Sequence, residues 1–455
     1  MQWRVESNRR SQQLSRTSRA VISLSAAGAE QYISGLQSIE YLHQSRTEEG
    51  LPSSHSINGC WKSLSKIAAI AVVSLALMGM TNCGGGNSGT SNCGTCGVTP
   101  QVATPTISTT NELNGALLVT LADSTTGAAI YYTIDGSTPT SSSTQYLAPF
   151  LVASNLTLNA IGTAAGETNS SVATQAFSPN IASGTLVWSD EFSNTGTSNI
   201  LPNSANWTYD TGYQCCGNDE QETYCAAGSN TSPCSSSNPN AFIAPSSAPN
   251  SGLNIVAMNP SGTTYTSARL KTEGLFSFQY GRLEAYMTLP EEQAMWPAFW
   301  MLGNNITTIS WPACGEADIM EHIDGDDTPF GGPGNGNPPG YDWIMGSVHG
   351  GPSSSAEVSE GNPYPSSSST NFSAAQWHTY GIIWTKGQIQ YYVDNSTNIY
   401  ATFNTSNFGG TWPFDQGPMF IILNLAVGGD WPGDVDSSTV FPQTMQVQYV
   451  RLYTN

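Results

Sequence analysis

Residues 311–322, Trp-Pro-Ala-Cys-Gly-Glu-Ala-Asp-Ile-Met-Glu-His, place three carboxylates, Glu316, Asp318 and Glu321, in an apolar, strand-like stretch. Charges in such a strand are costly unless they line a polar cleft. Side chains alternate along a strand, so Glu316 and Asp318 share a face, whereas Glu321 has the opposite parity. One extra residue, absorbed as a β-bulge around residues 319–320, would return Glu321 to that face. The stretch therefore predicts a bulged strand that carries an acidic cleft.

The spacing of these carboxylates suggests a chemistry. With the bulge, the carboxyl groups of Glu316 and Glu321 would lie about 5 to 7 Å apart, near the short spacing at which a carboxylate attacks a sugar directly. Glu316 would be the nucleophile and Glu321 the acid/base. Asp318 would hydrogen-bond the nucleophile and keep one glutamate protonated near neutral pH. Two other interpretations of the spacing remain open, a hard-cation site such as calcium and a solvated acidic strand.

The sequence around this strand predicts an all-β protein. Only 10% of the 455 residues are charged, 10% are aromatic, and 45 are glycine, a composition that disfavours long solvated helices. From residue 185 to 455, alternating segments are broken by Gly, Pro and Asn turns, and one apolar run, residues 419–427, suits a strand buried on both faces. We expect one large antiparallel β-sandwich over residues 185–455.

The charge balance excludes several classes of partner. Beyond residue 82 the chain has only five of its 13 Lys and Arg residues but 28 of its 33 Asp and Glu residues. Such a surface repels phosphate backbones and anionic lipid, which excludes nucleic-acid binding and disfavours polyanionic substrates. Neutral substrates remain possible, and we expect a monomer.

The N-terminal part predicts export. Residues 67–80, IAAIAVVSLALMGM, form an apolar run behind two lysines, too short to span a bilayer comfortably and typical of a signal peptide. Cys83 follows directly and begins a Gly/Ser-rich linker, residues 83–104, an arrangement that resembles the bacterial lipoprotein signal. Residues 1–82 are therefore interpreted as an extension and signal peptide. The resemblance implies a cell-envelope lipoprotein anchored to the membrane only through Cys83, and ordinary secretion is the alternative.

The cysteines fit an exported protein. Cys93 and Cys96 lie in the linker and suggest a small disulfide or a free pair. A loop region after residue 210 contains four cysteines that suggest one or two local disulfides of undetermined connectivity, namely Cys215, Cys216, Cys225 and Cys234. Cys314 is expected to be buried and unpaired.

Residues 105–178 predict a small separate unit of short strands, with the turn signal Asp135-Gly136 between two of them. The stretch from Ile130 to Thr140, IYYTIDGSTPT, resembles the chitobiase/β-hexosaminidase C-terminal-type domain. This resemblance implies a small immunoglobulin-like β-sandwich, interpreted as a non-catalytic spacer. A carbohydrate-binding patch on Tyr131 or Tyr132 is the alternative.

The larger unit resembles a known enzyme family. Residues 316–321, EADIME, are similar to the active-site signature E-x-D-x-x-E of family-16 glycoside hydrolases, and four other segments strengthen the match: residues 296–303 (WPAFWMLG), 346–350 (GSVHG), 412–416 (WPFDQ) and 423–429 (LNLAVGG). The resemblance is to the laminarinase-type branch. It implies a β-jelly-roll catalytic domain over residues 185–455 that acts on β-1,3-glucan or mixed β-1,3/1,4-glucan. It gives Glu316, Asp318 and Glu321 the roles already inferred from their spacing.

The same resemblance implies the residues of a substrate cleft. A glucan cleft needs flat aromatic platforms and fixed polar groups. The positions that match are Asn218, Arg269, Trp296, Trp311 and His349. Trp300 could lie in the core, Gln416 is a weaker candidate, and we expect His322 and His378 to be structural.

No cofactor is expected. Family members often bind a structural calcium through the glutamate that matches Glu191 and an aspartate on the last strand, but Gln448 stands at the second position, which makes calcium doubtful. Two other functions remain open. One is an agarase-like or carrageenase-like galactan hydrolase, and the other is an inactive carbohydrate-binding envelope protein.

Overall fold

The protein is described by a computed structural model over residues 99–323, 342–365 and 372–455. All of these described residues belong to one compact unit. Among the described residues, no helix has the length and apolar character needed to cross a bilayer. The predicted signal peptide, Cys83 and the Cys93/Cys96 pair lie outside the described residues.

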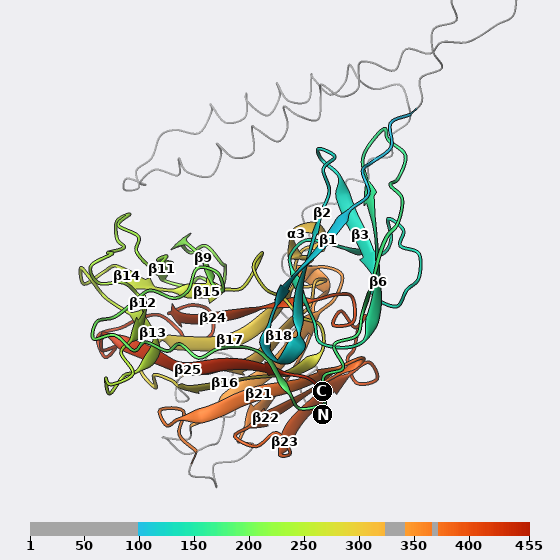
Figure 1. Cartoon of the computed structure of the whole chain (residues 1–455). Coiled ribbons are helices and arrows are strands. Elements are labelled where there is room, and N and C mark those ends of the chain that lie inside the picture. Colours follow the sequence, from blue (N-terminus) through green and yellow to red (C-terminus); the bar gives the residue numbers. More distant parts are fainter. Residues whose placement is uncertain (1–98, 324–341, 366–371) are drawn as a thin grey trace, which may run out of the picture. The chain divides into compact units, whose positions relative to one another are not determined.

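The larger part of the unit consists of two stacked antiparallel sheets, as expected for a jelly roll (Figure 1). One sheet has eight strands in the order β12-β13-β25-β16-β21-β22-β23, with β8 also paired to β25. Its strands are β8 (Leu186–Asp190), β12 (Ala241–Ala244), β13 (Gly252–Ala257), β16 (Gly281–Thr288), β21 (His378–Thr385), β22 (Gln388–Val393), β23 (Ile399–Asn404) and β25 (Gln443–Tyr453).

The other sheet has seven strands in the order β20-β19-β18-β17-β24-β15-β9 and carries the acidic stretch. Its strands are β9 (Thr208–Asp210), β15 (Arg269–Lys271), β17 (Met295–Gly303), β18 (Glu316–Glu321), β19 (Ile344–Gly350), β20 (Val358–Tyr364) and β24 (Met419–Val427). All nine residues of β24 are buried, which confirms the prediction of a strand buried on both faces.

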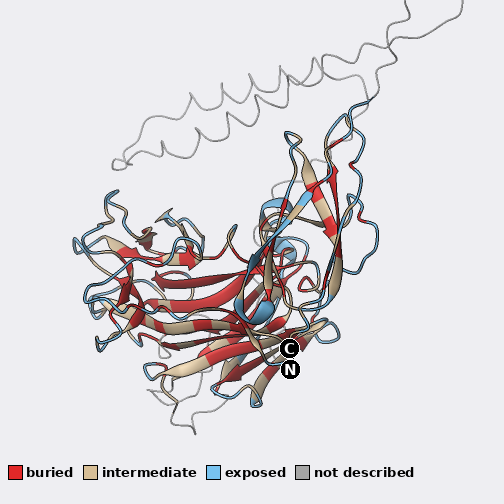
Figure 2. Cartoon of the chain, in the orientation of Figure 1, coloured by how far each residue is buried: buried red, intermediate tan, exposed pale blue. Residues whose placement is uncertain are grey.

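One hydrophobic core fills the space between the two sheets. Leu283 and Ile382 reach it from the eight-stranded sheet, and Phe299 and Ile421 reach it from the seven-stranded sheet. Figure 2 shows the buried residues concentrated along the strands of both sheets, whereas the connecting loops are mostly exposed. The side chains that alternate with these core residues point to the outer face of the seven-stranded sheet, where a small apolar cluster that includes Trp300 and Ile422 lies beside polar side chains.

The N-terminal part of the unit is a small β-sandwich with its own core, as the resemblance implied. A three-stranded sheet β1-β2-β5 faces a four-stranded sheet β4-β3-β6-β7. The strands are β1 (Thr106–Asn111), β2 (Leu117–Ala122), β3 (Ala129–Thr133), β4 (Thr144–Gln145), β5 (Phe150–Val152), β6 (Leu156–Thr163) and β7 (Ala173–Phe177). Tyr132 is buried and stacks on Phe150 with ring centroids 4.8 Å apart, so it belongs to this core and not to an exposed binding patch.

The remaining elements are short. They are β10 (Gly212–Tyr213), β11 (Glu222–Tyr224) and β14 (Tyr265–Ser267), which form a third small sheet, the helix α3 (Ile306–Ile309), and the 3-10 turns η1 (Leu113–Gly115) and η2 (Ser354–Ala356). Two disulfides, Cys215–Cys216 and Cys225–Cys234, confirm the prediction of local pairing in this loop region. Cys314 is free and buried, as expected.

Candidate active site

The bulge that the sequence predicts is present in β18. Asp318 pairs with Trp300 of β17 and Met320 pairs with Phe299, so Ile319 has no partner between them. The register with β19 shifts at the same place. Both Ile319 and Met320 lie in the core between the sheets. Glu321 is thereby returned to the outer face that Glu316 and Asp318 share.

The three carboxylates are held by hydrogen bonds from aromatic and hydroxyl groups. Nε1 of Trp311 donates to Oε2 of Glu316 at 3.0 Å, and Nε1 of Trp296 donates to Oε1 of Glu321 at 3.0 Å. Oγ of Ser347 donates to Oδ2 of Asp318 at 2.7 Å and lies 3.3 Å from Oε2 of Glu321. Two of the predicted cleft residues, Trp296 and Trp311, therefore contact the acidic groups directly.

His349 also belongs to this cluster. Its Nε2 lies 3.1 Å from Oδ2 of Asp318, and its Nδ1 lies 2.7 Å from Oε1 of Glu357. Ligand atoms of Glu316, Asp318 and His349 all lie within 4.8 Å of one another. Burial lowers the pKa of His349, but the hydrogen bond to Asp318 and the surrounding negative charges outweigh it and raise the pKa to about 11. The neighbouring carboxylates therefore favour the imidazolium form of His349 at neutral pH.

The pKa values of Glu316 and Glu321 are both raised above the ordinary value of a glutamate. Burial and the nearby charge of Asp318 raise the pKa of Glu316 to about 8, and the same two causes raise the pKa of Glu321 to about 8. The charges of His349 and Arg269 oppose this increase in the pKa of Glu316. Because the two glutamates interact, each apparent pKa of the site describes the pair and not a single residue. A site of this kind can contain a carboxylic acid and a carboxylate at the same time near neutral pH.

Arg269 lies on the same outer face as the carboxylates. Glu321 pairs with Ala298, which pairs with Asn424, which in turn pairs with Arg269 across adjacent strands. The guanidinium lies 4.5 Å from the centroid of the Trp300 ring and 3.0 Å from Oδ2 of Asp210. Arg269 therefore lies on the face that carries the carboxylates, and its role in binding substrate stays a prediction.

Trp300 packs in a small apolar cluster with Phe420 and Ile422. Its indole N–H also takes part in a hydrogen-bond network on this face. Only 9% of its surface is exposed, and its Nε1 donates to Oδ1 of Asn424 at 2.7 Å. Nδ2 of Asn424 donates to the hydroxyl of Tyr224 at 3.2 Å. The ring of Trp300 is therefore held in place by Asn424 and packs against the guanidinium of Arg269.

Asn218 is less closely tied to the site. It lies in the loop between β10 and β11 with a φ of 60° and an exposed side chain. Its backbone carbonyl accepts a hydrogen bond from the amide of Asp430 at 2.8 Å. Within the described part of the chain its side chain makes no hydrogen bond to the carboxylates. The structure thus fixes its backbone next to the loop after β24 but does not bring its amide group to Glu316 or Glu321.

The remaining candidates lie apart from the carboxylates. The backbone carbonyl of Gln416 accepts from the hydroxyl of Thr144 at 3.3 Å. His322 is buried with its Nδ1 2.7 Å from the carbonyl of Trp343, and His378 lies 2.8 Å from Asp394. Both histidines are held by structural partners, as expected.

Three site residues were missed from the sequence. Ser347 and Glu357 contact the acidic cluster, and Trp431 lies with its ring edge-on to Trp296 at a centroid distance of 5.5 Å. Ser347 is two residues before His349, so strand alternation could have placed it on the same face. No local signal marked the other two.

Glu191 and Gln448, the two residues at the positions of the family's calcium site, both form hydrogen bonds with other residues of the chain. Both carboxylate oxygens of Glu191 accept from Arg451, at 2.9 Å from Nε and 2.7 Å from Nη2. Nε2 of Gln448 donates to the carbonyl of Ser251 at 2.8 Å. A guanidinium already balances the charge of Glu191, so this residue set does not fit the calcium ion that the resemblance implied.

A β-sandwich whose bulged strand presents two glutamates around an aspartate defines the class of carbohydrate-cleaving enzymes that work with paired carboxylates. Comparison with known proteins agrees with this class. Residues 240–450 match the model of Glycosyl hydrolases family 16, and residues 109–174 match that of the Chitobiase/beta-hexosaminidase C-terminal domain.

One relative indicates the same family, and a second relative and a solved structure are also similar to the chain. A Beta-glucanase of Rhodothermus marinus is 34% identical over 281 residues, which cover 59% of this chain and 84% of the relative. Glucan endo-1,3-beta-glucosidase A1 of Niallia circulans is 31% identical over 292 residues, 60% of this chain but only 38% of that protein. The structure of the laminarinase catalytic domain from Thermotoga maritima MSB8 is 32% identical, covers 60% of this chain and 99% of that chain, and has a TM-score of 0.47. The chain belongs to family 16 of the glycosyl hydrolases.

Proposed function

We propose that this glycoside hydrolase cleaves β-1,3-glucan or mixed β-1,3/1,4-glucan within the chain and retains the configuration of the product. The bulge in β18 carries the proposal, because it places Glu316 and Glu321 on one face with Asp318 between them in sequence. The glucanases among the relatives support the choice of substrate.

The reaction would proceed by double displacement. Glu316, as carboxylate, attacks the anomeric carbon while Glu321, as acid, protonates the leaving glycosidic oxygen. In the second step Glu321 removes a proton from water, which displaces Glu316 and restores both groups. The charge of Arg269 acts on Glu316 and favours its ionised form. The pKa values of both glutamates are raised alike, to about 8, so the nucleophile role of Glu316 and the acid/base role of Glu321 rest on the resemblance to the family signature.

Asp318 would serve as the electrostatic partner of both glutamates. Its charge raises the pKa of each of them, and Ser347 and His349 fix its position. Trp296 and Trp311 would have two functions. Each orients one glutamate through its indole N–H and offers a ring face to the apolar C–H groups of a sugar.

Azide rescue of two variants tests the assignment of roles. Full-length Glu316→Ala and Glu321→Ala proteins are assayed on an aryl β-glucoside with a good leaving group, in the presence of azide. We expect Glu316→Ala to form a glycosyl azide of inverted configuration, because azide replaces the nucleophile. Glu321→Ala should form one of retained configuration, because azide intercepts the covalent intermediate. The reverse pattern would contradict the roles.

Substrate choice is tested by digestion of laminarin, lichenan, agarose and carrageenan with the wild-type protein. Arg269 and Lys271, the two cations on β15, are both paired with carboxylates, so the face offers little free positive charge to a sulfated galactan. We expect cleavage of the two glucans, with β-configured ends seen first by NMR. Release from carrageenan alone would support the galactan alternative, and binding without turnover would support the inactive carbohydrate-binding protein.

We also propose that the protein is exported as a monomer and anchored through a lipid on Cys83. The apolar run at residues 67–80 followed by this cysteine supports the proposal. In a bacterial host, Cys83→Ser should shift the protein from the membrane fraction to the soluble fraction. An unchanged distribution would favour ordinary secretion. Light scattering of the purified protein would measure the mass of the particle.

A further inference from the structure

A polar cavity lies on the face that carries the carboxylates, at some distance from them. Cross-strand partners in an antiparallel sheet point to the same face. Asp318 pairs with Trp300, Trp300 with Ile422, and Ile422 with Lys271, so these side chains form one row across four adjacent strands. With strands spaced by about 4.8 Å, Lys271 lies roughly 14 Å from Asp318 along the face.

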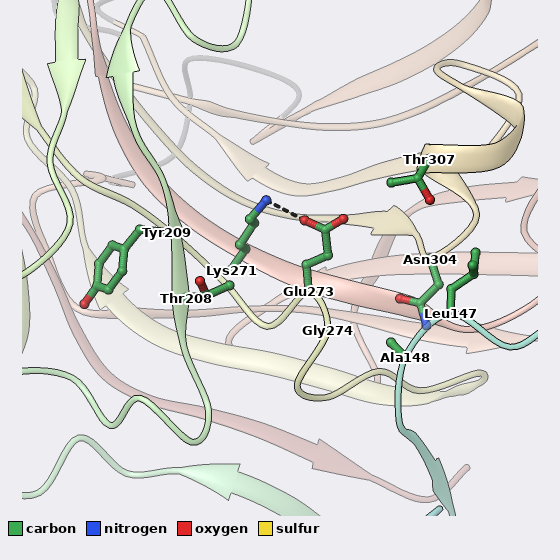
Figure 3. Close-up of a pocket in the computed structure, with 9 residues that line it drawn as sticks. All are labelled: Leu147, Ala148, Thr208, Tyr209, Lys271, Glu273, Gly274, Asn304 and Thr307. Carbon is green, nitrogen blue, oxygen red and sulfur yellow. Dashed lines mark hydrogen bonds and ion pairs between the residues drawn. The ribbon is translucent and has the colours of Figure 1, made fainter. Parts of the chain in front are cut away.

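The cavity at Lys271 has a volume of about 380 Å³ and is shared by the two sandwiches. Figure 3 shows the Lys271–Glu273 pair near its centre, with Asn304 and Leu147 on one side. Leu147 and Ala148 come from the small β-sandwich, in the segment between β4 and β5. The small sandwich therefore supplies one wall.

Hydrogen bonds hold that wall in place. The amide of Leu151 donates to the carbonyl of Ser277 at 2.9 Å. Oγ of Ser277 donates to the carbonyl of Pro149 at 2.7 Å, and Nδ2 of Asn304 donates to the same Oγ at 2.8 Å. The segment that contains Leu147 and Ala148 is thus linked through Ser277 to Asn304, which itself lines the cavity. A wall fixed in this way is pre-organised for a ligand.

The charges of the cavity suit a neutral, hydroxyl-rich ligand. Nζ of Lys271 lies 2.6 Å from Oδ1 of Asp210 and is also paired with Glu273. Asp210 also pairs with the guanidinium of Arg269, at 3.0 Å, so the two cations and the two carboxylates balance and leave no free positive charge for sulfate or carboxylate groups. Oδ1 of Asn304 is buried without a hydrogen-bond partner among the described residues. Carboxylate, ammonium, hydroxyl and amide groups together can donate to and accept from sugar hydroxyls.

We propose that this cavity is a remote subsite for the same neutral glucan, and that the small sandwich completes it. The inference rests on the proposed function, since the occupant is a distal part of the polymer whose other part lies over Glu316 and Glu321. It gives residues 105–178 a role in substrate binding through the Leu147 and Ala148 wall, whereas Tyr132 is buried in the core of the small sandwich.

A bulky side chain in the cavity tests the proposal in the full-length protein. Thr307 lines the cavity and is exposed, so Thr307→Trp fills the space without disturbing a core position. Ile309→Trp is the matched control, because Ile309 belongs to the same helix, is 43% exposed and does not line the cavity. Both are compared on laminarin and on an aryl glycoside of two glucose units, which is too short to reach Lys271.

We expect Thr307→Trp to lower kcat/KM for laminarin at least tenfold more than for the aryl glycoside, and Ile309→Trp to change neither. Glu273→Gln removes a charge at nearly constant shape. It should lower kcat/KM for laminarin at least threefold more than kcat/KM for the aryl glycoside. Equal losses on both substrates, or no loss on the polymer, would overturn the subsite.

A binding measurement separates this inference from the proposed function. In a Glu321→Gln background, calorimetric titration with laminarin should show a dissociation constant at least tenfold weaker when Thr307→Trp is added. An unchanged constant would refute the subsite alone. Failure of the wild-type protein to cleave laminarin or lichenan would refute the proposed function, whatever the titration shows.

Discussion

Ser347 donates a hydrogen bond of 2.7 Å from its hydroxyl to Oδ2 of Asp318 on the neighbouring strand. The same hydroxyl lies 3.3 Å from Oε2 of Glu321, and its hydrogen bond lowers the pKa of that glutamate against the larger effects of burial and the charge of Asp318. One small side chain therefore connects the central aspartate to the proposed acid/base.

Replacing Ser347 by alanine should slow the reaction and change its pH dependence. Removal of the hydroxyl leaves a buried carboxylate oxygen of Asp318 with one partner fewer, at a cost of about 1–3 kcal/mol. We expect kcat/KM to fall roughly 10- to 100-fold, and the alkaline limb of its pH profile to move upward because the pKa of Glu321 rises. Steady-state rates between pH 5 and 10 measure both. A uniform loss without a shift would contradict the link to Glu321.

Replacing Glu316 by glutamine should stabilise the protein at alkaline pH. The folded-state pKa of Glu316 is raised from 4.5 to about 8. Its contribution to stability is therefore fully present below the unfolded-state pKa and is lost as the pH rises through about 8. Glutamine carries no such dependence. We expect the Tm of Glu316→Gln to exceed that of the wild type more at pH 9 than at pH 5.

The size of this difference corresponds to a few kcal/mol at most. Thermal unfolding at the two pH values checks it. Glu292→Gln is a suitable control, since Glu292 lies outside the acidic cluster and hydrogen-bonds to Val440 and Gln443. An equal increase in Tm at both pH values would mean that the charge of Glu316 does not destabilise the fold.

The catalytic strand could be predicted because its geometry is local. Strict alternation gives the faces of Glu316 and Asp318, and the wrong parity of Glu321 requires one extra residue. The structure places that residue at Ile319. The partners of these carboxylates were harder to predict, because Glu357 comes from a different strand region and reaches the cluster only through His349.

Other features depended on choices that sequence alone leaves open. Four cysteines in one loop region allow three pairings, and only the fold selects Cys225–Cys234 together with the adjacent pair. Trp300 could have been core or cleft, and its position under Arg269 makes it the support of a cleft residue. The cavity between the two sandwiches had no sequence signal, because it forms only when distant segments meet.

Chelators should leave the stability of the protein unchanged. The carboxylate of Glu191, which the family resemblance assigned to calcium, is bound by both Nε and Nη2 of Arg451. We expect the same Tm with EDTA and with added calcium. A loss of Tm in EDTA that calcium restores would contradict this expectation. Arg451→Met should lower the stability only slightly, by about 1 kcal/mol or less, because the pair is largely exposed to solvent.

Glu222 should tolerate glutamine but not alanine. Its side chain is 1% exposed, and burial and the nearby charge of Glu220 raise its pKa well above the ordinary value. Its Oε2 accepts a hydrogen bond from the amide of Val427 at 2.7 Å. Burial therefore favours the neutral form of Glu222, and glutamine is neutral and keeps this acceptor. We expect Glu222→Gln to change the free energy of unfolding by about 1 kcal/mol or less.

Glu222→Ala removes the acceptor and leaves a cavity beside the buried amide of Val427, so it should cost about 2–4 kcal/mol. Denaturant unfolding of the two variants at pH 7 measures the difference. If glutamine were as damaging as alanine, Glu222 would have to be ionised in the folded protein. The pair with Glu220 would then need a compensating cation, and Arg269, whose charge lowers the pKa of Tyr224, is one candidate.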